Sequence, residues 1–195
     1  DDLSLLPEVK AADALLATPW LHAAGNHDLD FDAPDDARSL ESFRNQFGPD
    51  TFAWEETNAN FIVLDDVVYL PGNRPDYIGG LRESQFAFLQ AYLAQADNTK
   101  LLVIAAHIPL FQTGNGRETF RSDDRSRLFS LLKPFRDVLL LTAHSHTQTH
   151  YRHGPDSGWT GPGRLYEYNA GATCGAFWSG VKDADGIPDT VMSDG

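Results

Sequence analysis

Two continuous apolar segments, residues 101–106 and 138–141, constrain the fold of this chain most strongly. Uninterrupted apolar runs of this length predict strands that are buried on both faces, as in α/β proteins. His107 follows the first run directly, and His144 and His146 follow the second after two further residues. Because ligands of α/β sheets gather at the carboxyl ends of strands, these positions predict a site at one edge of a sheet.

The tetrapeptide Gly25-Asn26-His27-Asp28 is a third candidate for this site. It follows the apolar segment 20–24, which predicts a strand that ends at the rim of the sheet. Amide oxygens, imidazoles and carboxylates are groups that bind metals or transfer protons. Considered alone, the tetrapeptide is equally compatible with a surface turn, because Gly and Asn tolerate positive φ angles. Its combination with the two histidine clusters favours a functional site.

In this order, the three blocks resemble those of the calcineurin-like metallophosphoesterases. That family carries an Asn-His-Asp/Glu block, a lone histidine after a buried strand, and a Gly-His-x-His block. Ala143 stands here where the family usually has glycine, and the resemblance extends from Asp1 to about Arg152. The family's first two blocks, Asp-x-His and Gly-Asp-x-x-(x)-Asp, do not occur before Asn26. We therefore expect a catalytic domain that is truncated on its N-terminal side.

The resemblance implies a four-layer αββα sandwich of the metallophosphoesterase type that lacks its first strands. The residue pattern alone predicts an α/β or α+β fold, because helices and strands alternate first and strands dominate later. Residues 1–195 would form the partial phosphoesterase domain. Residues 159–195 are rich in glycine and aromatic residues, and they would cover the site or lead to a further C-terminal domain.

Hydrophobic periodicity predicts the remaining elements. Apolar residues at helical spacing predict helices at 3–16, 36–47, 82–95 and 123–132. Short apolar or alternating runs predict strands at 51–54, 61–64, 67–70, 147–151 and 165–168. Asp65 and Asp66 are expected to form a solvated hairpin turn between two of these strands.

The resemblance also implies a set of metal ligands. Asn26, His107 and His144 would hold one divalent ion. His146 would bind a second ion, whose other ligands belong to the missing blocks. Two divalent ions would be present in the full-length enzyme, as Mn, Fe or Zn, because imidazole nitrogen and amide oxygen suit all three. The present chain would hold one ion or none.

The catalytic roles implied by the resemblance fall on His27 and Asp28. His27 would act as a general acid that protonates the leaving oxygen. Asp28 would accept a hydrogen bond from the His27 ring, orient it and raise its basicity. The implied function is hydrolysis of a phosphomonoester or phosphodiester at a binuclear metal centre. The truncated chain by itself is expected to be a poor catalyst.

Two other functions stay open at this point. A non-catalytic relative could keep the fold as an interaction scaffold, although a scaffold has no need of His27 with Asp28. A mononuclear zinc hydrolase of another fold could use the paired histidines with an open water position. That enzyme would have no use for the Asn-His-Asp block.

Composition limits the partners of this chain. The formal net charge of −13 at pH 7 argues against DNA, RNA and anionic membranes, which require clusters of lysine and arginine. It does not argue against a small phosphorylated substrate, because bound divalent cations reverse the local field. No apolar run in the sequence is long enough to span a membrane.

Cysteine content and strand edges give two further expectations. The single cysteine, Cys174, excludes an internal disulfide and leaves the compartment open between cytoplasmic and periplasmic or secreted. A domain without its first strands would expose the edge of a core strand, so we expect self-association through that edge.

Overall fold

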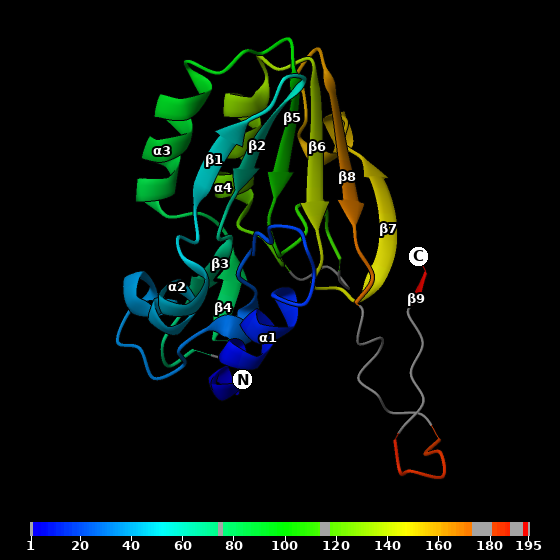
Figure 1. The fold of residues 1–195 in the computed structure, drawn as a ribbon. Helices are drawn as coiled ribbons and strands as arrows, with labels where there is room; N and C mark the ends of the chain where they lie inside the picture. Colours follow the sequence, from blue (N-terminus) through cyan, green and yellow to red (C-terminus); the bar gives the residue numbers. More distant parts are fainter. Residues whose placement is uncertain (1, 74–75, 114–117, 173–180, 188–192, 195) are drawn as a thin grey trace.

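The computed structural model describes residues 2–73, 76–113, 118–172, 181–187 and 193–194. It contains one seven-stranded sheet and a separate two-stranded sheet, β3-β4 (Figure 1). The strands are β1 (Phe52–Glu55), β2 (Ala59–Val63), β3 (Val67–Tyr69), β4 (Tyr77–Gly79), β5 (Leu101–Ala105), β6 (Asp137–Thr142), β7 (Thr147–Arg152), β8 (Arg164–Asn169) and β9 (Ser193–Asp194). The α-helices are α1 (Leu6–Asp13), α2 (Glu41–Phe47), α3 (Glu83–Leu93) and α4 (Ser122–Leu132). Short 3-10 turns are η1 (Leu3–Leu5), η2 (Asn26–Asp28), η3 (Asp36–Arg38) and η4 (Pro155–Ser157).

The centre of the large sheet is parallel. Its strand order is β1-β2-β5-β6-β8-β7-β9, and β2, β5, β6 and β8 run in the same direction. β1 and β7 pair antiparallel with β2 and β8 at the two sides. The apolar runs 101–106 and 138–141 supply β5 and β6, which are neighbours in this centre. Since parallel strands end at the same edge of a sheet, the loops after β2, β5 and β6 lie together.

Helices α3 and α4 cover one face of this sheet (Figure 1). Successive side chains of a strand point to opposite faces, so every second residue faces the helices. These residues join the apolar sides of the two helices in a single core, which includes Ile62, Leu102, Ile104, Val138, Leu140, Phe86, Leu89, Leu128, Phe129 and Leu132. Burial of this apolar surface holds β5 and β6 in place, and with them the loops that carry His107 and His144.

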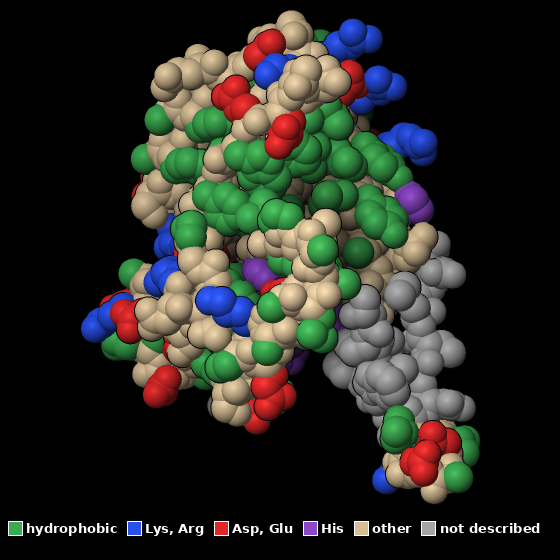
Figure 2. Space-filling view, viewed as in Figure 1, with side chains coloured by type: hydrophobic (Ala, Val, Ile, Leu, Met, Phe, Trp, Pro, Cys, Tyr) green, Lys and Arg blue, Asp and Glu red, His purple; other side chains and the backbone are tan. Residues whose placement is uncertain are grey.

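The opposite face of the sheet presents apolar side chains to the surface. Figure 2 shows hydrophobic side chains gathered across it. Trp54 stacks on Phe61 with ring centroids 4.7 Å apart, and Leu101 and Leu141 are 37% and 36% exposed. Single exposed apolar residues are ordinary, but a contiguous group is not. Helices α3 and α4 therefore bury only one of the two faces, so the prediction that both apolar runs form strands buried on both faces was wrong for Leu101 and Leu141.

The mixed α/β fold expected from the sequence is confirmed. The helices predicted at 82–95 and 123–132 are α3 and α4. The other two predicted helices are each divided: residues 3–16 contain η1 and α1, and residues 36–47 contain η3 and α2. Within the described part of the chain, no helix is long and apolar enough to cross a lipid bilayer.

The strand predicted at residues 20–24 is not formed. Trp20 and Leu21 in this segment are 49% and 55% exposed. An apolar run becomes a strand only where a neighbouring strand exchanges backbone hydrogen bonds with it. Among the described residues, no strand pairs with this segment, so the prediction from periodicity alone was wrong.

Asp65 and Asp66 do not form the predicted solvated turn. The strands on either side, β2 and β3, belong to different sheets and do not pair. Both aspartates are 1% exposed. The prediction was wrong because turn preferences describe the local chain, whereas the burial of these carboxylates depends on loops that arrive from elsewhere in the sequence.

Candidate metal centre

The side chains of Asn26, His107 and His144 converge, although they come from three separate loops. Nε2 of His107 lies 2.8 Å from Oδ1 of Asn26 and 3.1 Å from Nδ1 of His144. Nδ1 of His144 lies 3.0 Å from Oδ1 of Asn26. One oxygen and two nitrogens thus form a small triangle at the edge of the sheet.

The parallel centre of the sheet explains this convergence. His107 and His144 each stand two residues after a strand, β5 and β6 respectively. The strands are in register with Ala105 opposite Leu141, and the backbone N–H of Ala143 donates to the carbonyl of His107 at 2.9 Å. Both histidines therefore leave the sheet at the same edge and level. Asn26 begins the 3-10 turn η2 and is 6% exposed.

The three atoms fit a divalent metal ion better than they fit one another. The amide oxygen of Asn26 has no hydrogen to donate, and a neutral imidazole has one N–H and one lone pair. At least one of the three contacts must therefore bring two lone pairs or two hydrogens together. A shared cation removes this conflict. Bonds of about 2.0–2.2 Å to one ion bring its nitrogen and oxygen ligands to about 3 Å from one another, and these atoms are 2.8–3.1 Å apart.

The asparagine oxygen is needed to complete this donor set. Among the described residues, no group of three or more His, Cys, Asp or Glu side chains could hold a metal ion. Imidazole nitrogen combined with amide oxygen suits borderline ions such as Mn, Fe and Zn. The candidate centre thus consists of two histidines together with Asn26.

Burial keeps the two imidazoles in the form that binds metals. Burial, assisted by positive charge on His144, lowers the pKa of His107 to about 3. Burial also lowers the pKa of His144, followed by positive charge on His146 and His27. A ring with a lowered pKa is neutral near pH 7 and offers a lone pair. Positive charge on His27 and His146 lowers the pKa of His107 in the same direction.

The backbone that carries His144 and His146 is left-handed at both residues, with φ angles of 62° and 58°. This conformation costs about 1–2 kcal/mol for a residue with a Cβ atom. Strained backbone of this kind clusters at functional sites. The positive φ angles fall on the two histidines rather than on Ala143, so alanine is compatible with the position where glycine was expected.

Gly25 is required by the close approach of the His107 ring. A Cβ atom at Gly25 would lie 2.9 Å from Cε1 and 3.0 Å from Nδ1 of His107. Side chains do not approach so closely, so only glycine lets the ring lie against the backbone before Asn26.

Asp28 stabilises the same loop from within. Its Oδ2 atom accepts a hydrogen bond from the backbone N–H of Gly25 at 2.7 Å. Burial raises the pKa of the Asp28 carboxyl, and the bond from Gly25 opposes this shift. His27 lies between Asn26 and Asp28 and is exposed. The predicted hydrogen bond between Asp28 and His27, like the catalytic roles, stays a prediction.

Asp66 is a site residue that sequence reasoning missed. Its Oδ1 atom accepts hydrogen bonds from the backbone N–H groups of His107 and Ile108, at 2.9 and 3.0 Å. Burial raises the pKa of Asp66 well above its usual value, although these two bonds oppose the shift. The signal was present, because Asp65 and Asp66 follow an apolar strand directly, as His107 does. The carboxylate of Asp66 thus fixes the start of the His107 loop.

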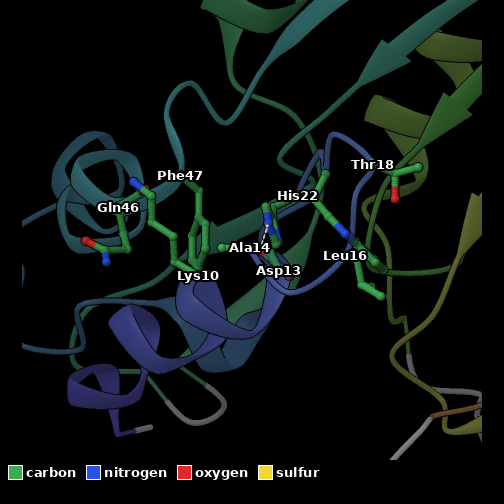
Figure 3. A pocket seen from close by; sticks show the side chains of 9 residues that line it. Lys10, Asp13, Ala14, Leu16, Thr18, His22, Gln46 and Phe47 are labelled. Atoms are coloured by element: carbon green, nitrogen blue, oxygen red, sulfur yellow. Dashed lines mark hydrogen bonds and ion pairs between the residues drawn. The ribbon is translucent and has the colours of Figure 1, made fainter.

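A separate pocket of about 300 Å³ lies beside the chain that leads to η2 (Figure 3). In it, Nε2 of His22 contacts Oδ2 of Asp13 at 2.8 Å, and the His22 ring packs on Phe47 with centroids 4.2 Å apart. The residues that line the pocket do not include Asn26, His107 or His144. These contacts fix α1 and α2 against the segment that enters the loop, apart from the metal centre.

Comparison with known proteins identifies the family to which this chain belongs. Residues 3–148 match the model of the calcineurin-like phosphoesterase family, and residues 167–195 match the model described as the C terminal of calcineurin-like phosphoesterase. The first match covers most of the chain, so the chain belongs to the calcineurin-like phosphoesterase family. This membership excludes the zinc hydrolase of another fold.

The chain is also similar to a solved structure, a dimetal phosphatase from Danio rerio. The TM-score is 0.56 and the sequence identity is 17%. The match covers 87% of this chain and 66% of that chain. At this identity the likeness establishes the metallophosphoesterase fold alone. A search of curated proteins gave no match.

Proposed function

We propose that this chain provides the metal-binding and proton-donating part of a phosphoesterase that hydrolyses a phosphomonoester or phosphodiester. One observation carries the proposal: Oδ1 of Asn26, Nε2 of His107 and Nδ1 of His144 lie within 3.1 Å of one another. No arrangement of protons satisfies all three contacts, whereas a divalent cation does. Membership of a phosphoesterase family gives that cation its chemical purpose.

Asn26, His107 and His144 would hold one divalent ion, as Mn, Fe or Zn. When bound, divalent ions in such a centre activate water and neutralise charge that develops on the phosphoryl group. His146 would be a ligand of a second ion, since it follows His144 in the same strained turn. Residues 1–25 contain neither Asp-x-His nor Gly-Asp. We therefore expect the chain by itself to bind at most one ion and to hydrolyse phosphoesters slowly.

His27 would act as the general acid. It is exposed and directly follows Asn26, so its ring can reach a phosphoester held beside the centre. Its role would be to donate a proton to the leaving oxygen. Asp28 would steady the loop through its bond to the backbone of Gly25. A carboxylate beside an imidazole also favours the protonated ring that a general acid needs.

Hydrolysis of p-nitrophenyl phosphate and bis(p-nitrophenyl) phosphate, with Mn²⁺ or Zn²⁺ added, tests the proposal and separates monoester from diester activity. The variant Asn26→Ala should abolish the metal-dependent rate. The control His150→Ala removes an exposed imidazole from β7, outside the centre, and should leave that rate unchanged. A rate that needs no metal, or that survives in Asn26→Ala, would contradict the proposal. Absence of any hydrolysis with either metal would favour the non-catalytic scaffold.

A further inference from the structure

Glu167 is a buried acidic side chain on β8 that the proposed chemistry does not use. It is 0% exposed and lies on the same side of β8 as the core residue Leu165. Burial of a carboxylate is unfavourable unless hydrogen bonds compensate for the lost water. The partners of Glu167 therefore indicate its role.

One oxygen of Glu167 contacts the loops of both candidate histidine ligands. Oε1 accepts a hydrogen bond from the backbone N–H of Leu110 at 2.9 Å and another from the Thr142 hydroxyl at 2.8 Å. Leu110 is three residues after His107, and Thr142 is two residues before His144. The Oε1 atom of Glu167 thus forms hydrogen bonds with both the segment that follows His107 and the segment that precedes His144.

The second oxygen of Glu167 is held by His153. Its Oε2 atom lies 2.7 Å from Nε2 of His153, and Nδ1 of that ring lies 3.1 Å from the Ser157 hydroxyl. The His153 and Glu167 side chains are both 0% exposed. With both oxygens engaged and both side chains buried, the carboxyl group cannot rotate away from Leu110 and Thr142 without losing a hydrogen bond.

Asn169 is the next inward-facing residue of β8, and it forms hydrogen bonds with the loop that carries His144 and His146. Its Nδ2 atom donates to the Ser145 hydroxyl at 2.6 Å and to the carbonyl of Thr147 at 2.7 Å. Ser145 lies between the two residues with left-handed backbone. The inward side chains of β8 therefore hold the His144 loop in the conformation that the candidate centre requires.

We propose that Glu167 is a positioning residue that sets the separation of His107 and His144 and thereby the metal affinity of the centre. The inference rests on the proposed function only in requiring that Asn26, His107 and His144 bind an ion. It does not depend on hydrolysis. A network that served stability alone would change unfolding without changing the affinity of the folded protein for metal.

Titration with Co²⁺ tests the inference, because its visible absorption reports both affinity and ligand geometry. The variant Glu167→Ala should weaken Co²⁺ binding about 10- to 100-fold, the usual effect of losing a residue that orients metal ligands, and should alter the spectrum. Glu167→Gln should stay near the wild-type affinity, because its amide oxygen still accepts from Leu110 and Thr142.

Leu89→Ala is the matched control. Leu89 is 0% exposed in α3, and its truncation lowers stability without touching the network. It should lower the melting temperature and leave Co²⁺ affinity unchanged. If Glu167→Ala does not fold, the variant Thr142→Val takes its place in the test. It removes one hydrogen-bond donor to Oε1 of Glu167 and keeps a β-branched residue in β6. We expect it to weaken Co²⁺ binding several-fold.

The outcomes separate this inference from the proposed function. Wild-type affinity and spectrum in Glu167→Ala, or in Thr142→Val where that variant decides, would overturn the positioning role. An equal loss of affinity in Leu89→Ala would overturn it as well. Absence of Co²⁺ binding by the wild-type chain would instead contradict the metal centre itself, and the positioning role with it.

Discussion

Nε2 of His107 lies 3.1 Å from Nδ1 of His144, although the two residues are 37 positions apart in the sequence. Two neutral imidazoles at this distance can share at most one N–H in a hydrogen bond between them. Oδ1 of Asn26 lies 2.8 Å from Nε2 of His107 and 3.0 Å from Nδ1 of His144, so it competes for the same hydrogen. This geometry is unfavourable without a cation and favourable with one.

Gly25→Ala should displace the His107 ring. The new Cβ atom would stand 2.9 Å from Cε1 of that ring, closer than side-chain carbons approach. Because the backbone of Gly25 is fixed by Asp28, the ring rather than the loop should move. We expect metal affinity to fall about tenfold, the lower end of the effect of disturbing ligand orientation. Isothermal titration with Zn²⁺ measures it.

Gly154→Ala is the control for this experiment. A Cβ atom at Gly154 would have no atom within 4 Å, and its φ angle of −147° suits any residue. Zinc affinity should match that of the wild type. Equal affinities in Gly25→Ala and the wild type would mean that the ring position does not control binding.

Asp66→Asn should make stability less dependent on pH in metal-free protein. Burial raises the pKa of Asp66 in the folded state, so between its unfolded and folded pKa values the folded chain binds more protons. Stability contributed by this group is therefore present below about pH 4 and is lost as pH rises towards the folded pKa. Asparagine keeps an acceptor for His107 and Ile108 without this loss. In urea unfolding, the stability of the variant should rise relative to that of the wild type as the pH increases above about 4.

Asp137→Asn provides a control of opposite sign. A hydrogen bond from Arg164 lowers the pKa of Asp137, so its contribution is present above the unfolded pKa and lost in acid. This variant should lose stability relative to the wild type as the pH rises. A pH trend of the same sign in both variants would show that burial of Asp66 is not the cause.

Arg82→Met should destabilise the fold strongly. Nη1 of Arg82 lies 2.5 Å from Oδ2 of Asp65, whose side chain is 0% exposed. Removing the cation leaves a buried carboxylate unpaired, which costs about 3–5 kcal/mol. Burial already raises the pKa of Asp65 to about 6 despite Arg82. The loss should therefore be larger at pH 8, where this carboxyl is ionised, than at pH 5.

Arg38→Met tests whether position rather than charge explains that loss. Arg38 pairs with Asp35 at 2.6 Å, but the two side chains are 55% and 49% exposed. An exposed pair contributes at most about 1 kcal/mol. Comparable destabilisation by Arg38→Met and Arg82→Met in urea unfolding would contradict the structural role of the buried pair.

His27→Ala should lower turnover while leaving metal content unchanged. A general acid contributes about 10²- to 10⁴-fold to the rate. The loss should be larger for phenyl phosphate than for p-nitrophenyl phosphate, because a poor leaving group needs the proton more. Steady-state kinetics combined with metal analysis checks this. A parallel loss of bound metal, or an equal decrease in turnover for both substrates, would contradict the role of His27 as general acid.

Much of the fold could be predicted because apolar runs carry their own signal. Strands β5 and β6 were predicted from continuous hydrophobic sequence, and their parallel pairing brings His107 and His144 together. The segment 20–24 is also mostly apolar, apart from His22, but it forms no strand. Pairing depends on a second strand, and that information is not local.

The supporting residues of the centre were harder to predict than its ligands. Asp66 occupies a turn-like sequence, and its burial depends on backbone N–H groups at His107 and Ile108. Glu167 alternates with apolar residues in β8, but alternation alone does not show that its face is the buried one. In both cases the decisive contact joins residues far apart in the chain.

Equilibrium dialysis against Zn²⁺, followed by elemental analysis, tests the central claim most directly. The wild-type chain should bind one ion, as should the control variant His150→Ala, because His150 lies outside the triangle formed by Asn26, His107 and His144. His107→Ala and His144→Ala should each lose the ion. Retention of one ion with unchanged affinity in both variants would contradict the claim that these two imidazoles and Asn26 form a metal centre.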